Sequence, residues 1–129
     1  MAGTGENVRT TRILCIDDDA EFALLLKCTI ERFGHQVTTF TDATLALDAL
    51  DKRPNDWDMV ITDYHMPGIG GLAVARHLKQ HHPALPFTVI SNHITDIMIA
   101  AAAGAGVRGL RQKPAAPAQF ADLVGIAAD

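Results

Sequence analysis

Acidic, hydroxyl and ammonium side chains stand directly after short apolar runs at several points of this chain. The set comprises Asp17, Asp18, Asp19, Asp63, Ser91 and Lys113. Carboxylates that lie close together raise one another's pKa, so a nearby cation is needed to stabilise all of them in the ionised form. Mg²⁺ fits this need because it binds one or two carboxylates, a carbonyl oxygen and water. With Lys113 as a second positive charge, a carboxylate such as Asp63 can attack phosphorus and form an acyl phosphate.

The elements that must position these groups alternate between buried runs and helical patterns. We expect strands at 12–16, 36–41, 59–62, 87–90 and 107–112, and helices at 21–33, 42–53, 72–82, 94–103 and around 120–124. This alternation predicts an α/β fold with a five-stranded parallel sheet and helices on both faces, doubly wound and flavodoxin-like. In the common strand order 2-1-3-4-5, ligands bind beyond the carboxyl ends of the strands, so the polar groups converge on one pocket.

Helical spacing predicts which faces of the first two helices are buried. On the first helix the inward stripe comprises Phe22, Leu25, Leu26, Thr29 and Phe33. On the second it comprises Leu45, Ala46, Ala49 and Leu50. Ala20, Leu24, Lys27 and Glu31 are then left on the outer face of the first helix.

Length and composition restrict the class of protein. The chain has 129 residues, 48% apolar and 5% aromatic, with a formal net charge of −4, which suits one domain with an aliphatic core. No basic patch favours direct nucleic-acid binding, and no apolar run reaches the roughly 20 residues that span a membrane. Cys15 and Cys28 lie in apolar runs, which suits reduced, packed thiols and a cytoplasmic location. We expect residues 1–11 to be a disordered leader and 12–129 to form the domain.

Four separated motifs give the chain a resemblance to a known family. They are Ile13–Asp18, Val60–Gly68, Pro86–Ser91 and Lys113-Pro114. Together they resemble the receiver domain of two-component response regulators over about 12–127. The resemblance implies that Asp63 is phosphorylated by a sensor histidine kinase or a histidine phosphotransfer protein.

The resemblance also implies roles for the surrounding residues. Mg²⁺ would be held by Asp17, Asp18, Asp63 and the backbone carbonyl of His65. Ser91 and Lys113 would contact the phosphoryl oxygens, and the Lys113–Pro114 bond would be cis. The switch would involve Ser91 and Leu110.

Departures from the family pattern concern the rim of the pocket and the output mechanism. Leu110 stands where similar proteins often have an aromatic residue, and Asn92 stands where they often have a smaller one. His65 and His93 occupy positions that flank the phosphoryl group, so their side chains and Asn92 are expected to tune its lifetime. We expect His77, His81 and His82 to be solvated, without a special role.

The resemblance implies a signalling module that assists its own phosphorylation and is not an enzyme acting on an external substrate. Its partners would be an effector protein in trans, or an output domain absent from this chain. Separately, the alanine-rich segment 97–103 with Ala116, Ala118 and Ala121 indicates an apolar patch for a homodimer or an effector, and the alternative is an alanine-rich helix face that needs no partner. The alternative is a receiver-like interaction module that does not cycle phosphate. Hydrolases similar to haloacid dehalogenases are disfavoured because His65 occupies the position of their second aspartate. Flavin binding is disfavoured because Asp17–Asp19 would repel its phosphate.

Overall fold

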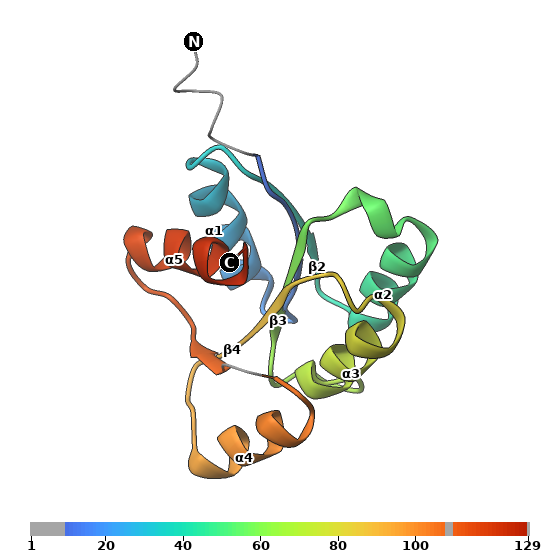
Figure 1. Cartoon of the computed structure of the whole chain (residues 1–129). Helices are drawn as coiled ribbons and strands as arrows, with labels where there is room; N and C mark the ends of the chain where they lie inside the picture. The colour runs from blue at the N-terminus through green and yellow to red at the C-terminus, as the bar shows by residue number, and fades with distance from the viewer. Residues whose placement is uncertain (1–9, 108–109, 129) are drawn as a thin grey trace.

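The computed structural model describes residues 10–107 and 110–128, and most of the predicted leader, residues 1–9, lies outside them. The strands are β1 (Arg12–Ile16), β2 (Gln36–Phe40), β3 (Met59–Asp63), β4 (Phe87–Ser91) and β5 (Leu110–Gln112). The helices are α1 (Ala20–Glu31), α2 (Ala43–Lys52), the 3-10 turn η2 (Pro54–Asp56), α3 (Gly71–His81), α4 (Asp96–Gly104) and α5 (Pro117–Ala128). The five strands are parallel in the order β2-β1-β3-β4-β5, which confirms the predicted fold class (Figure 1).

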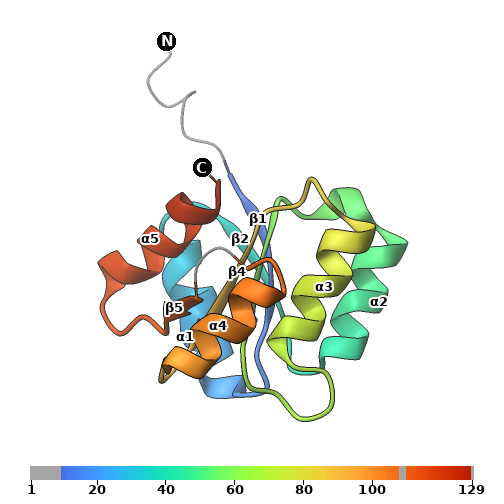
Figure 2. The same cartoon turned by 60° about the horizontal axis from the view of Figure 1, so that its bottom comes forward.

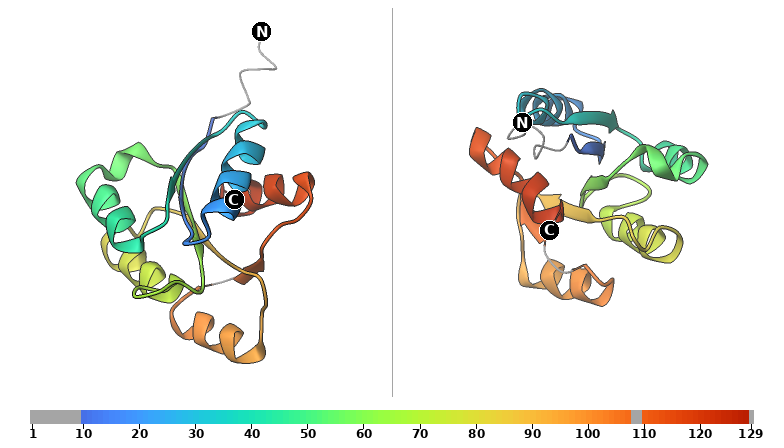
Figure 3. Two further views of the ribbon diagram at one scale, coloured as in Figure 1. Left: turned by 180° about the vertical axis from the view of Figure 1, so that it is seen from behind. Right: turned by 45° about the horizontal axis from the view of Figure 1, so that its top comes forward.

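Helices cover both faces of this sheet because its central strands are apolar on both sides. Alternate residues of β1 point to opposite faces: Ile13 and Cys15 join one core cluster, and Leu14 and Ile16 join another. The helices α1 and α5 pack on the first face, whereas α2 and α3 pack on the second (Figure 2). On the second face α4 follows α3, where Ala102 packs in a smaller cluster with the α3 residue Ala75 (Figure 3).

Side-chain caps fix where several of these helices begin. The carboxylate of Asp19 accepts a hydrogen bond from the backbone of Phe22 at 3.1 Å, and this cap starts α1 at Ala20, three residues after Asp17. Asp42 caps α2 in the same way. Gly34, with φ of 93°, permits the turn after α1 that leads into β2. The carboxyl end of each strand therefore passes quickly into the next helix.

The predicted inward stripes are wrong at three positions. Leu25, Phe33 and Leu45 are 50%, 44% and 61% exposed. On α1 the face toward the sheet is formed by Ala23, Leu26 and Ile30. The run of three leucines permits more than one stripe at helical spacing, and the small Ala23 side chain lets the helix lie close to the sheet.

The two cysteines differ in their surroundings. Cys15 is buried in β1, where burial raises the pKa of its thiol to about 12. Cys28 is exposed on α1, contrary to the expectation of two packed thiols, because it lies outside the Ala23, Leu26 and Ile30 face. Across the described residues, no helix has the length and apolar character needed to cross a membrane.

Candidate functional site

Polar side chains from four strands meet at the carboxyl edge of the sheet, as the predicted topology requires. Asp17 follows β1, and its backbone N–H donates to the carbonyl of Phe40 at 3.0 Å. Lys113 follows β5, and its N–H donates to the Ser91 carbonyl at 2.9 Å. An open pocket at this edge is lined by Asp18, Asp63, His65, Ser91, Asn92, His93 and Lys113, among others. Asp17 lies beneath them and is fully buried.

Three carboxylates share this edge. Oxygen atoms of Asp17, Asp18 and Asp63 lie within 4.8 Å of one another. Burial and the neighbouring carboxylates of Asp17 and Asp18 raise the pKa of Asp63, the Lys113 ammonium lowers it, and the net result is a pKa of about 6. The ionised cluster therefore favours the arrival of a cation.

Lys113 supplies one positive charge to this cluster. Its Nζ lies 2.8 Å from Oδ2 of Asp17 and 3.7 Å from Oδ2 of Asp63. Burial alone would lower the pKa of Lys113, but the contact with Asp17 and the charges of Asp63 and Asp19 together outweigh burial and raise the pKa above its ordinary value. The ammonium also lies 4.5 Å from the centre of the Phe22 ring, a cation–π contact that sequence reasoning missed. Phe22 stood only in a helical stripe, which gives no sign of a charged neighbour.

Gly71 brings the start of α3 against Asp63. Its N–H donates to the carbonyl of Tyr64 at 2.9 Å. A Cβ atom at Gly71 would lie 2.3 Å from the carbonyl oxygen of Asp63, so no larger residue fits without a shift of the backbone. This close approach holds the loop from Asp63 to Gly71 in place.

Ser91 lies at the end of β4 and is almost fully buried. Its hydroxyl donates a hydrogen bond to the backbone carbonyl of His93 at 2.8 Å. Thr95, whose Oγ1 accepts from Met98 at 3.2 Å, is the residue that caps α4. The Ser91 hydroxyl is therefore not the cap of α4.

The expected cis bond between Lys113 and Pro114 is wrong, since no cis peptide occurs in the described residues. The trans isomer is the intrinsically favoured one. The backbone hydrogen bond from Lys113 to Ser91 continues the pairing of β5 with β4 and directs the lysine into the pocket without a cis bond.

The remaining predicted residues lie at different distances from the carboxylates. His65, Asn92 and His93 are exposed at the rim of the pocket. The backbone of His65 hydrogen-bonds to the Asp63 carboxylate and lowers its pKa. Leu110 is half-buried and packs on the cluster that holds Ala102, so the structure does not bring it into the pocket.

The expectation that His77 and His82 are merely solvated is wrong. Both rings contact the carboxylate of Asp51 on α2, because α2 and α3 pack side by side on the same face of the sheet. His81 is exposed, as expected.

A comparison with protein families identifies the class of domain. The family model described as "Response regulator receiver domain" matches residues 13–125. The chain belongs to this family. It is therefore a receiver domain of two-component signalling. The family consists of signalling modules rather than of enzymes that turn over external substrates.

Relatives and solved structures agree with this assignment. The chain is 34% identical over 121 residues to the sensory/regulatory protein RpfC of Xanthomonas campestris, covering 91% of this chain but 16% of that protein. It is 35% identical over 79 residues to the transcriptional regulator NtrC of Escherichia coli, again 16% of the relative. A receiver domain from Clostridium thermocellum superposes with a TM-score of 0.79 at 26% identity, covering 92% of this chain and 94% of that one. Chemotaxis protein CheY4 of Vibrio cholerae gives a TM-score of 0.82 at 19% identity, covering 92% and 99%.

Proposed function

We propose that this receiver domain is a Mg²⁺-dependent phosphoacceptor switch and that Asp63 is the acceptor. The observation that supports this most is the carboxylate of Asp63 in an open pocket, between two further carboxylates and the ammonium of Lys113. The donor is the phosphohistidine of a sensor histidine kinase or a histidine phosphotransfer protein. An oxygen of Asp63 forms a bond to phosphorus while the phosphorus–nitrogen bond of the donor breaks, and the released imidazole nitrogen takes up a proton.

The residues present at this edge fit Mg²⁺. Oδ2 of Asp17 is buried and, among the described residues, accepts no hydrogen bond of good geometry; its close contact is the ion pair with Lys113. The other donors are carboxylate oxygens, which Mg²⁺ prefers. Asp17, Asp18, Asp63 and the backbone carbonyl of His65 would hold the ion. When bound, it supplies positive charge that keeps Asp63 ionised and neutralises phosphoryl oxygens.

Lys113 and Ser91 serve the other side of the phosphoryl group. Lys113 neutralises a phosphoryl oxygen through its ammonium, which the contact with Asp17 already orients. The Ser91 hydroxyl donates to the His93 carbonyl in the present conformation, and we infer that it turns to a phosphoryl oxygen after transfer. That turn frees the segment that leads into α4, and Leu110, which packs against the cluster that includes Ala102 of α4, repacks with it. The side chains of His65, Asn92 and His93 at the rim adjust the access of water to the acyl phosphate.

Two helices carry exposed apolar side chains that suit protein partners. Leu24 and Leu25 on α1 are 60% and 50% exposed, and we assign this face to the histidine-containing donor. Ile97 and Ile99 on α4 are 82% and 52% exposed, and we assign this face to an effector in trans, an output domain outside this chain or a second copy. The two free cysteines suit a reducing compartment, and we propose a cytoplasmic location.

Incubation with a small phosphodonor and Mg²⁺, followed by intact mass measurement, tests the proposed function. We expect the mass of one phosphoryl group to be added in wild type and none in Asp63→Asn. Asp51→Asn, which removes a carboxylate outside the pocket, is the matched control and should be modified as fully as wild type. If wild type remains unmodified while the donor labels another receiver domain, the interaction module that does not cycle phosphate replaces this proposal.

A further inference from the structure

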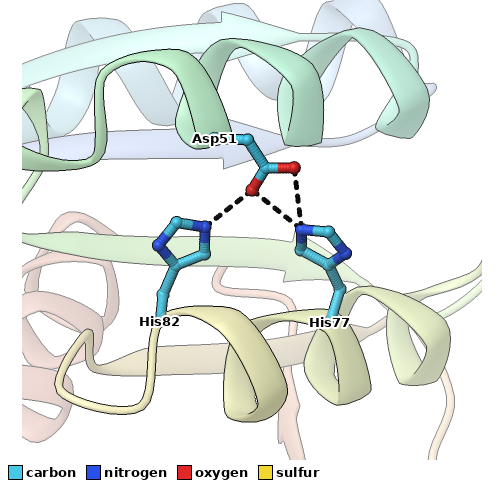
Figure 4. A group of neighbouring side chains, drawn as sticks. All are labelled: Asp51, His77 and His82. Atoms are coloured by element: carbon cyan, nitrogen blue, oxygen red, sulfur yellow. Dashed lines mark hydrogen bonds and ion pairs between the residues drawn. The ribbon is translucent and has the colours of Figure 1, made fainter.

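A second cluster of titratable side chains lies between the C-terminal parts of α2 and α3. Asp51 projects from α2 toward two imidazole rings of the α3 region (Figure 4). Nε2 of His77 lies 2.9 Å and 3.1 Å from the two carboxylate oxygens, and Nε2 of His82 lies 2.7 Å from Oδ1. Within the described part of the chain this is one of two groups of three ligand-type residues close enough to share one ion.

The geometry of this cluster is that of ligands converging on one point. One nitrogen of each ring and a carboxylate oxygen lie within 4.8 Å of one another. Each ring donates its Nε2 proton to the carboxylate, which as an ion can only accept. One cation at this point would replace both protons and keep all three side chains in place.

Packing holds the three residues near this arrangement while leaving one side open. Asp51 follows Leu50 and His77 precedes Leu78, and both leucines are fully buried in the core cluster that joins α2 to α3. His82 terminates α3 and its side chain is 11% exposed, against 25% for His77 and 45% for Asp51. The solvent-facing side can therefore admit an ion and a water ligand.

The ligand chemistry selects the kind of ion. Two imidazole nitrogens and one carboxylate oxygen, with an open position for water, form a typical four-coordinate set for Zn²⁺. Imidazole also suits Cu²⁺ and Ni²⁺, whereas Mg²⁺ prefers a set made of oxygens alone. This set therefore differs from that of Asp17, Asp18 and Asp63, which offers oxygen only.

We propose that Asp51, His77 and His82 form a second metal site, which binds Zn²⁺ or a similar transition-metal ion. The ion ties the end of α2 to the end of α3. Asp63 contacts the opposite end of α3, at Gly71. Along a helix that rises 1.5 Å per residue, Gly71 lies about 9 Å from His77 and about 16 Å from His82. The proposed metal site is thus separate from the Asp63 pocket, and metal binding there does not depend on phosphorylation of Asp63.

Calorimetric titration of the untagged, metal-free protein with Zn²⁺ in excess Mg²⁺ tests this site. We expect one ion per chain, and His77→Gln or His82→Gln should weaken binding by at least about 100-fold, since losing even a hydrogen-bond partner of a ligand weakens metal binding 10- to 100-fold. His81→Gln is the matched control, because His81 lies beside His77 but makes no contact with Asp51 in the cluster. Asp63→Asn controls for Zn²⁺ binding at the Asp63 carboxylate cluster, and Cys28→Ser controls for binding at the exposed thiol. All three control variants should bind Zn²⁺ as tightly as wild type does.

A second measurement keeps the test independent of how well the variants fold. The long-range ¹H–¹⁵N spectrum of the wild-type imidazoles should show Zn²⁺ on the Nε2 atoms of two rings, those of His77 and His82. At an excess of about 100 times the dissociation constant, Zn²⁺ should raise Tm by about 5–10 °C. The proposal is overturned if no stoichiometric binding occurs, if the histidine variants bind as wild type does, or if the spectrum places the ion on other rings. Each of those results would mean that Asp51 only forms hydrogen bonds with His77 and His82 and that the three residues do not bind a metal ion.

Discussion

The two ends of α3 lie beside two clusters of titratable side chains that differ in composition and in physical character. At its start, Asp63 lies among carboxylates and a lysine, with Asp63 and Lys113 each less than 10% exposed in their side chains. At its end, Asp51 is 45% exposed and faces two imidazoles. Burial and like charges raise the pKa of Asp63, whereas the hydrogen bonds from His77 and His82 outweigh burial and lower the pKa of Asp51.

This difference shows why a cation would relieve the cost of ionisation at the first cluster, whereas ionisation at the second carries no such cost. Ionisation of Asp63 opposes folding, and the same excess of negative charge favours Mg²⁺ and a phosphoryl group beside it. Ionisation of Asp51 favours folding, and its neighbours offer nitrogen ligands. Four substitutions, ordered from the largest expected effect on stability to the smallest, test the contrast.

Replacing the ammonium of Lys113 should have the largest effect. Lys113→Met keeps most of the side-chain volume but leaves the buried Asp17 carboxylate without its partner, and loss of one member of a buried pair costs about 3–5 kcal/mol. The free energy of unfolding, measured with urea in Mg²⁺-free buffer, should fall by that amount. Lys52→Met removes an exposed pair with Asp48 and should change it by less than about 0.5 kcal/mol. Equal losses in the two variants would contradict the strong coupling at the Asp63 edge.

Adding a methyl group at Gly71 should disturb the Asp63 end of α3. The new Cβ would lie 2.3 Å from the Asp63 carbonyl oxygen, and overpacking of this kind costs about 2–3 kcal/mol. Gly125→Ala in α5, where a Cβ meets nothing within 4 Å, should instead raise stability by about 0.5–1 kcal/mol. Thermal unfolding measures the stability of both variants. If Gly71→Ala is as stable as wild type, the start of α3 is not fixed against Asp63.

The pH dependence of Asp63→Asn should reveal the cost of ionising this buried acid. The folded-state pKa of Asp63, about 6, lies above the ordinary 3.8. Protonated Asp63 therefore contributes to the free energy of unfolding in full below pH 3.8, and this contribution is lost as pH rises through about 6. Asp63→Asn should therefore be more stable than wild type by about 1–3 kcal/mol at pH 8 without Mg²⁺, since one pKa unit is about 1.4 kcal/mol. The difference should vanish at pH 3.5. A destabilised variant at pH 8 would reverse the sign and contradict the pKa direction.

The same change at Asp51 should have the opposite sign and a smaller size. The lowered pKa of Asp51 means that its ionised form stabilises the fold above the ordinary pKa of 3.8, and that this stability is lost as pH falls through the lowered pKa. Asp51→Asn should lower the free energy of unfolding at pH 7 by less than about 1 kcal/mol, as expected for an exposed pair. Urea unfolding across pH 3–8 measures the change in the free energy of unfolding for Asp51→Asn and for Asp63→Asn. If the two variants change it in the same direction, the clusters do not differ as described.

Sequence reasoning predicted the Asp63 edge because topology alone determines it. Asp17, Asp63, Ser91 and Lys113 each stand at the end of a strand, and a parallel sheet brings such ends together whatever the helices do. The role of Phe22 and the conformation of the Lys113–Pro114 bond depend on local packing, so neither could be derived from strand order.

The Asp51 cluster was missed because it depends on how two helices are rotated against each other. Asp51 and His77 are 26 residues apart, and nothing in the spacing along the chain joins them. The available signal was that Asp51 and His77 each adjoin a leucine of the core, Leu50 and Leu78, which sets the sides of α2 and α3 that they occupy. The same kind of ambiguity in rotation made the inward stripe of α1 wrong at Leu25.

Locating the acyl phosphate within the chain tests the proposed function most directly. After phosphorylation of wild type with a small phosphodonor and Mg²⁺, borohydride reduction and peptide mass spectrometry identify the carboxylate that carried the phosphoryl group. We predict reduction at position 63 alone. Reduction at Asp17, Asp18 or Asp51, or an unreduced chain that nevertheless gained the phosphoryl mass, would contradict the assignment of Asp63 as the acceptor.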